Sequence, residues 1–103
     1  MSLIIIQTTC PNAEEARKIA KVLIEKKLAA CVQMTDIESF YMWQDDFCND
    51  KEVLINIKTK KENFKKIQSK IKELHSYDVP EIICVNIENV SKDYKKFIGE
   101  NTK

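Results

Sequence analysis

The chain has 103 residues, of which 44% are hydrophobic and 32% are charged, and its formal net charge is +1. This length fits a single domain over residues 1–103, and the composition is that of a soluble globular protein. A net charge near zero gives no electrostatic reason to expect a nucleic acid or an anionic membrane as a partner. No apolar run approaches the roughly 18 residues of a membrane-spanning helix, and the first residues lack the basic segment of a signal peptide. We therefore expect a soluble, cytoplasmic protein with no membrane insertion.

Glycine and cysteine usage excludes several kinds of site. Gly99 is the only glycine, so the glycine-rich loops that bind phosphates and dinucleotides are absent. The four cysteines are too far apart in sequence for a local zinc knuckle or redox pair. Cys31 and Cys84 lie in apolar, strand-like runs and are expected to be buried. Cys10 and Cys48 lie in expected connections, where a reactive thiol is possible, although no basic residue flanks Cys10 to lower its pKa.

The first half of the chain begins with a strand and a helix. Residues 3–9 are rich in β-branched side chains and predict a strand. Asn12 is a candidate N-cap, with Glu15 three residues later in the arrangement of a capping box. A helix to about Lys27 is then predicted by apolar residues at helical spacing, namely Ala16, Ile19, Ala20, Leu23 and Ile24.

A long hairpin is predicted next. Residues 29–43 have the composition of a strand, residues 44–50 form a polar tip, and residues 52–58 form the returning strand. If extended, the first arm would span about 50 Å at roughly 3.3 Å per residue. The predicted helices, of roughly 15 residues each, would measure about 22 Å. The hairpin must therefore bend or project, and its unpaired edges favour pairing with another subunit.

The second half repeats the pattern. Thr59 and Glu62 form a second candidate capping box. It precedes a helix whose apolar face comprises Phe64, Ile67, Ile71 and Leu74. A last strand over residues 81–87 and a short helix over residues 91–98 complete the chain. The order β-α-β-β-α-β with a trailing helix predicts an α+β, ferredoxin-like fold with both helices on one face of an antiparallel sheet.

The sheet face turned away from the helices is expected to be partly apolar. It is too apolar for open solvent and too polar for a simple core, which is typical of a half-hydrated subunit interface. We therefore expect a homo-oligomer. The residues assigned to this face are Leu3, Ile5, Gln7, Leu54, Asn56, Lys58, Ile82, Cys84 and Asn86.

Several blocks, in order along nearly the whole chain, match a known family. They are Thr8-Thr9-Cys10-Pro11-Asn12, Leu28-Ala29-Ala30-Cys31-Val32, Tyr41-Met42-Trp43, residues 53–59, and the connector with His75, Tyr77, Val79 and Pro80. Through these blocks the chain resembles the CutA family, small trimeric proteins named for divalent-cation tolerance. The resemblance implies a ferredoxin-like protomer, a homotrimer made by pairing hairpins, clefts between subunits, and a distant architectural similarity to PII signal-transduction proteins.

The sequence departs from the family pattern in three places. Residues 34–38 replace the usual Pro-Gly bend, and His75-Ser76-Tyr77-Asp78 replaces His-Pro-Tyr-Glu. Phe97 lies near the place where a tryptophan is common. The bend in the second strand and the terminal helix are therefore not carried over from the family.

His75, the only histidine, is the candidate metal ligand. It lies on a connector that Pro80 stiffens, and a neutral imidazole can bind copper or zinc. Because one histidine is too few ligands for a stable site, a trimer would supply three copies or pair His75 with a neighbour's Cys31 or Glu81. The alternative is a ring that packs at a subunit boundary and hydrogen-bonds a backbone group.

The resemblance also implies a polar cleft between subunits. It places around this cleft Cys31, Gln33, Trp43, Lys58, Thr59, Tyr77 and Glu81. Such a cleft could bind a small anion or zwitterion, or its polar groups could form a network that fixes the register of the trimer. Trp43 could likewise be an interface anchor or a ligand platform.

The leading hypothesis is a non-enzymatic trimer of the CutA type, linked to metal-ion response and weak binding of copper or another divalent cation, with no required cofactor. Cys31, His75 and Glu81 have the residue types of a nucleophilic site, but the apolar surroundings of Cys31 disfavour an enzyme. The alternative is a PII-like regulatory module that binds a small metabolite and docks onto a partner protein. A copper chaperone would need two thiols in the first loop, and an RNA-binding module would need aromatic residues on its strands; both are disfavoured.

Overall fold

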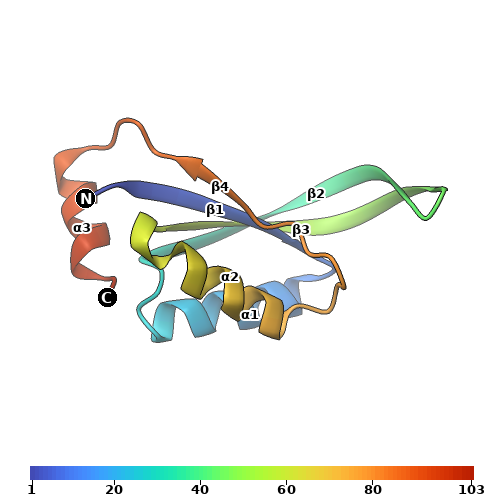
Figure 1. Ribbon diagram of the computed structural model, residues 1–103, viewed down its shortest axis with the longest axis horizontal. Helices are drawn as coiled ribbons and strands as arrows, with labels where there is room; N and C mark the ends of the chain where they lie inside the picture. The colour runs from blue at the N-terminus through green and yellow to red at the C-terminus, as the bar shows by residue number, and fades with distance from the viewer.

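The computed structural model describes all 103 residues and confirms the α+β, ferredoxin-like fold. Its elements are β1 (Leu3–Cys10), α1 (Ala13–Glu25), β2 (Cys31–Trp43), β3 (Asp46–Lys60), a 3-10 turn η1 (Lys61–Asn63), α2 (Phe64–Leu74), β4 (Ile83–Asn86) and α3 (Lys92–Glu100). The strands form one antiparallel sheet in the order β2-β3-β1-β4. Helices α1 and α2 lie side by side on one face of this sheet (Figure 1).

The core lies between the two central strands and these two helices. Alternate residues of β1 and β3 point to the helices, and α1 and α2 contribute residues at helical spacing. Eight side chains at the centre are fully buried, namely Ile4, Ile6, Ile19, Leu23, Ile55, Ile57, Ile67 and Ile71. Burying a side chain of this size contributes roughly 1.5–3 kcal/mol, so this layer is the main source of stability.

The predicted N-cap of α1 is confirmed. The Asn12 Oδ1 accepts a hydrogen bond from the Glu15 N–H at 2.8 Å. The Glu15 carboxylate does not complete a capping box, however. It reaches the segment after α2, where its Oε2 lies 3.5 Å from both the Ser76 amide nitrogen and the His75 Nδ1. The first turn of α1 is thereby joined to the end of α2.

The second predicted capping box is wrong. Thr59 belongs to β3 and faces the core, and no side chain caps η1. The Thr59 hydroxyl donates to the Leu28 carbonyl oxygen at 2.6 Å, and the Asn63 Nδ2 donates to the same oxygen at 3.0 Å. The hydroxyl therefore satisfies a buried backbone group of the loop before β2 instead of a helix end.

The predicted polar tip at residues 44–50 is also wrong, because β3 already begins at Asp46. The turn consists of Gln44 and Asp45, whose φ angles of 49° and 68° suit a two-residue hairpin turn. The ladder then continues from the Trp43–Asp46 pair down both arms. Polar residues are compatible with strands in an arm that is open to solvent on both faces, so composition did not reveal the pairing.

The arm formed by β2 and β3 projects well beyond the helices, as predicted (Figure 1). The molecule measures 45 × 25 × 21 Å, and its radius of gyration is 14.2 Å. A compact chain of this length would have a radius of gyration of about 13 Å. No helix has both the length and the apolar character needed to cross a membrane.

The open face of the sheet differs from the prediction at β4. Directly opposed residues of antiparallel strands point to the same face, and Ile83 pairs with Gln7 while Val85 pairs with Ile5. Ile83 and Val85 are therefore on the open face, where they are 46% and 47% exposed. Both sides of this strand are apolar in sequence, so the pattern could not fix its orientation. The open face is more apolar than expected.

Candidate functional site

The connector after α2 is held by the ring of His75. The His75 N–H ends the helix by donating to the Ile71 carbonyl oxygen at 2.8 Å. Its Nε2 lies 2.6 Å from the Thr9 carbonyl oxygen, and its Nδ1 lies 3.1 Å from the Tyr77 amide nitrogen. Since a carbonyl only accepts and an amide N–H only donates, Nε2 carries the proton and Nδ1 keeps a lone pair. The prediction that the ring could bond a backbone group is confirmed.

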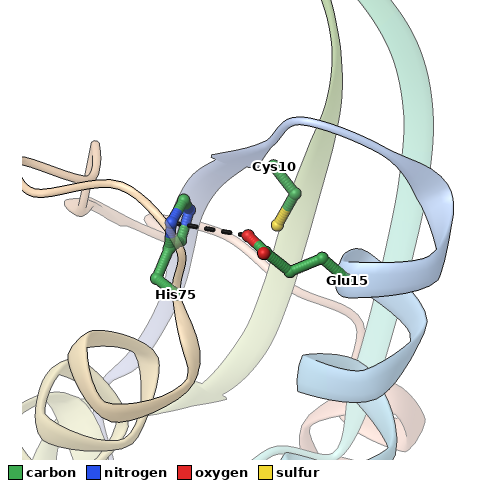
Figure 2. Close-up of side chains that lie close together, drawn as sticks. All are labelled: Cys10, Glu15 and His75. Atoms are coloured by element: carbon green, nitrogen blue, oxygen red, sulfur yellow. Dashed lines mark ion pairs between the residues drawn. The ribbon is translucent and has the colours of Figure 1, made fainter.

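The ring is part of a buried cluster of three side chains (Figure 2). The cluster consists of Cys10 at the end of β1, Glu15 in the first turn of α1, and His75. Their sulfur, oxygen and nitrogen atoms lie within 4.8 Å of one another. Cys10 is fully buried, the His75 side chain is 0% exposed and that of Glu15 is 16% exposed. The three groups could hold a metal ion between them.

The electrostatics of this cluster disfavour a free thiolate. Burial is the main cause that raises the pKa of the Cys10 thiol to about 12, and the negative charges of Glu15 and Glu52 contribute to this rise. The expectation that nothing lowers the pKa of Cys10 is therefore confirmed. Its placement in a connection is wrong, because it is the last residue of β1 and belongs to the core.

A pocket of about 680 Å³ lies between the arm and the connector. Its walls include Tyr41, Trp43, Glu52, Tyr77 and Glu81. The Tyr77 hydroxyl donates to the Glu52 Oε2 at 2.8 Å, and Glu52 is only 7% exposed. Burial, together with this hydrogen bond, raises the pKa of Tyr77. The pocket thus combines aromatic surfaces with a fixed phenol–carboxylate pair.

The same arm carries a second phenol–carboxylate pair beside the pocket. The Tyr41 hydroxyl donates to the Asp50 carboxylate across the β2–β3 ladder. This hydrogen bond is the main cause that raises the pKa of Tyr41 to about 12. Tyr41 therefore stays a neutral phenol at any physiological pH.

A separate polar group lies on the open face of the sheet. The Lys58 Nζ donates to the Gln33 Oε1 at 2.6 Å and lies 5.7 Å from the centre of the Tyr94 ring. Cys31 pairs with Lys58 across the ladder. Burial raises the pKa of Tyr94, and a hydrogen bond with Cys31 adds to the effect. This group joins the sheet to α3.

Comparison with known proteins identifies the family. The sequence matches the CutA1 divalent ion tolerance protein family over residues 4–101. The divalent-cation tolerance protein CutA of Pyrococcus horikoshii is 40% identical over 101 residues, which cover 98% of this chain and 99% of that one. The chain belongs to the CutA1 family.

Solved structures of CutA1 proteins agree with this assignment. The periplasmic divalent cation tolerance protein CutA of Archaeoglobus fulgidus matches with a TM-score of 0.96 at 38% identity, covering 98% of this chain and 99% of that one. The CutA1 structure from Oryza sativa matches with a TM-score of 0.97 at 34% identity, covering 100% of this chain and 95% of that one. The long arm and the connector are thus shared with other CutA1 proteins.

Within this CutA1 chain, the predicted cleft residues fall into separate groups. Trp43, Tyr77 and Glu81 line the pocket. Gln33 and Lys58 form the polar group on the open face, with Cys31 beside them. The structure corrects the prediction for Thr59, which is buried on the helix side.

The predicted metal partners of His75 are not brought to it within one chain. Cys31 pairs with Lys58, which pairs with Ile5, near the opposite end of β1 from Cys10. Glu81 lines the pocket, whereas the unprotonated Nδ1 of His75 contacts the Tyr77 amide and the Glu15 carboxylate. A contact from a neighbouring subunit's Cys31 or Glu81 stays a prediction.

The burial predicted for two cysteines is wrong. Cys31 is half-buried and Cys84 is exposed, while Cys48 is half-buried. Both Cys31 and Cys84 lie in apolar runs, but β2 and β4 are the two edge strands of the sheet and are covered incompletely. An apolar run does not reveal whether its strand lies at the edge or in the centre.

Sequence reasoning missed the partners of the connector. The sequence indicates Glu15 only as part of a helix cap, and Glu52 only as the start of a strand. One signal could have identified Glu52 as a site residue: its carboxylate directly precedes the apolar run Val53-Leu54-Ile55. Tyr41 belonged to a block that matched the family but received no role. None of these three could be paired with His75 or Tyr77 without the register of the sheet.

Proposed function

We propose that this CutA1 protein acts in the tolerance of divalent metal ions, copper among them, as a homotrimer that catalyses no reaction. Two lines of support concern the family: the match spans residues 4–101, and the similar proteins of Pyrococcus horikoshii and Thermus thermophilus are named divalent-cation tolerance proteins. The proposal needs no cofactor other than the cation itself.

The observation that carries the trimer is the amount of apolar surface that one chain leaves uncovered. Large side chains are exposed along the arm and on the open face of the sheet, namely Phe40, Met42, Trp43, Phe47, Ile83 and Val85. The outer edge of β2 also has unpaired backbone groups, which favour pairing with another strand. Copies of the same chain would cover both features, and a closed ring of three leaves no arm unpaired.

Two measurements test this proposal. Sedimentation equilibrium is expected to give about three times the chain mass of 12.0 kDa. A folded species of one chain mass at micromolar concentration would contradict the trimer. Cells that lack the protein are expected to grow less well in elevated copper, and unchanged growth would contradict the role in tolerance.

Features of both candidate nucleophiles support the absence of catalysis. The Cys10 thiol has a raised pKa of about 12 and is fully buried. Cys31 lies far along the sheet from the only histidine and so lacks a general base from its own chain. The compartment in this proposal is the cytoplasm, whose reducing conditions suit four free thiols. Cell fractionation checks it, since the Archaeoglobus protein is described as periplasmic.

A second candidate function is a PII-like regulatory module that binds a small metabolite and docks onto a partner protein. The volume of the pocket favours it, because 680 Å³ falls within the range of about 300–1,000 Å³ typical of ligand pockets. A thermal-shift screen separates the two functions. Stabilisation by an organic ligand and not by divalent metals would favour the regulatory module.

A further inference from the structure

The cluster of Cys10, Glu15 and His75 brings together three donors from three separate elements. The end of β1 supplies a sulfur, the first turn of α1 a carboxylate, and the end of α2 a ring nitrogen. Figure 2 shows the sulfur and the carboxylate pointing into the same space beside the imidazole. Two of these side chains are completely buried, so their positions are fixed by the packing of the core.

This set of donors fits a particular class of cation. Thiolate, imidazole and carboxylate are the ligands of zinc, and sites with three protein ligands keep a fourth position open. Bond lengths of about 2.0–2.3 Å place tetrahedral ligands roughly 3.3–3.8 Å apart. The three atoms already lie within 4.8 Å of one another. The Glu15 Oε2 and the His75 Nδ1 are 3.5 Å apart, which is already the spacing of two such ligands.

The histidine is already in the required tautomer. Its Nε2 proton is held by the Thr9 carbonyl oxygen at 2.6 Å, so the lone pair is on Nδ1. Metal-binding histidines usually have this arrangement, in which the ring nitrogen that does not bind the metal donates its proton to a carbonyl or carboxylate oxygen. Nδ1 accepts from the Tyr77 N–H at 3.1 Å and lies 3.5 Å from Glu15. At the ring, coordination requires that the Tyr77 hydrogen bond be released.

The local charge also favours a cation. Glu15 and Glu52 create a negative potential at Cys10, which disfavours a second negative charge and favours a positive one. When a divalent cation binds, the Cys10 S–H bond breaks, the proton leaves to solvent, and a sulfur–metal bond forms. The dication, one thiolate, one carboxylate and a neutral imidazole then sum to zero charge, which reduces the cost of burial.

We propose that the Cys10 Sγ, the Glu15 carboxylate and the His75 Nδ1 bind Zn²⁺ or a similar divalent cation within a single chain. This inference deepens the proposed function and rests on it for its role in the cell, but the site itself needs no second subunit. Entry is past Glu15, the most exposed of the three side chains. Ser76 and Tyr77 form the segment that has to yield as the ion enters.

Titration of the full protein with Co²⁺ tests the site, because a cobalt–thiolate bond gives a near-ultraviolet charge-transfer band. We expect this band on binding and its loss when Zn²⁺ displaces the Co²⁺. Cys10→Ser is expected to abolish the band and to weaken binding by at least about tenfold, because replacing even a residue that only supports a metal ligand typically costs about that much affinity. Glu15→Gln is expected to keep the band with weaker binding.

Cys31→Ser and Cys84→Ser serve as matched controls, and both are expected to keep the band. Loss of the band in Cys31→Ser would overturn the proposal and place the metal at a subunit boundary. A band that persists in Cys10→Ser, or no band in the unaltered protein, would also overturn it. If Cys10→Ser does not fold, the weaker binding of Glu15→Gln, with unchanged circular dichroism, still decides the question.

Growth of cells lacking the protein separates this proposal from the proposed function. Cobalt and zinc binding at Cys10 without a metal-sensitive phenotype would support the site and contradict the tolerance role. A metal-sensitive phenotype in the absence of any cobalt–thiolate band would support the role and contradict the site.

Discussion

The His75 Nε2 donates to the Thr9 carbonyl oxygen at 2.6 Å and so joins residues 66 positions apart. This bond ties the end of α2 to the end of β1, which is where the buried cluster and the pocket adjoin. It also decides which ring nitrogen carries the proton. One hydrogen bond therefore contributes both to the packing of two elements and to the chemistry available at Nδ1.

Replacement of His75 by alanine is expected to lower the free energy of unfolding by about 2–4 kcal/mol. The change removes a buried ring and leaves the Thr9 carbonyl without its donor, and each effect is destabilising. Urea unfolding measures it. His75→Gln is the control, because a glutamine amide can still donate to Thr9 and is expected to recover roughly half of the loss. A loss below about 0.5 kcal/mol in His75→Ala would contradict a structural role for the bond.

The same His75→Ala variant is expected to bind copper more weakly while remaining a trimer. The variant loses a nitrogen ligand, but the arm and the open sheet face are unchanged. Calorimetry measures the affinity and sedimentation the assembly. Unchanged copper affinity would remove His75 from any metal site in this protein.

Thr59 and Asn63 are expected to be strongly coupled, because both donate to the Leu28 carbonyl oxygen. Thr59→Val and Asn63→Ala are each expected to cost about 1–2 kcal/mol, since one donor remains. The double variant leaves the buried carbonyl unpaired and is expected to cost at least about 1 kcal/mol more than the sum. Additive costs in a double-mutant cycle would show that the two donors act independently.

Stability is expected to fall as the pH rises above about 10. The pKa of Tyr77 is raised in the folded chain, while the unfolded phenol titrates near 10. The folded state therefore holds its proton longer, and stability present below pH 10 is lost as the pH rises further. Urea unfolding between pH 8 and pH 11 follows this decline. Tyr77→Phe is expected to make the decline shallower, and parallel curves for the two proteins would contradict this origin.

A charge at the end of the arm is expected to disrupt the trimer and leave the protomer folded. Phe47 is 70% exposed in one chain and contacts no part of the core. Phe47→Asp would place a charge in the proposed interface, where an unpaired charge is costly. Lys18→Glu, on the exposed face of α1, is the control and is expected to remain trimeric. Sedimentation and circular dichroism measure both variants, and an intact Phe47→Asp trimer would exclude the arm from the interface.

The elements with a strong period could be predicted from the sequence. The Asn12 cap, the apolar spacing of α1 and α2, and the alternation of β3 each reflect local physics, and all of these agree with the structure. The start of β3 could not be predicted, since the polar residues after Asp45 pair across the ladder in an arm that needs no apolar face. The orientation of β4 required its pairing with β1.

The candidate sites were less accessible to sequence reasoning. The resemblance to the family implies that Tyr77, Trp43 and Glu81 share a cleft between subunits, and all three line one pocket of the single chain. The neighbours of His75 were missed because Cys10 and Glu15 are 65 and 60 positions away in the chain. Their meeting depends on the register of β1 and the packing of α1 against α2, which no local pattern encodes.

Tyr77 contributes its backbone amide to the ring of His75 and its hydroxyl to the pocket wall through Glu52. A cation that takes the lone pair of Nδ1 must release that amide, and we expect the phenol of the same residue to shift with it. Occupancy on one side of the connector is thereby communicated to the other, and thermodynamic linkage makes the influence equal in both directions. The two sides are joined by only three consecutive residues, His75-Ser76-Tyr77.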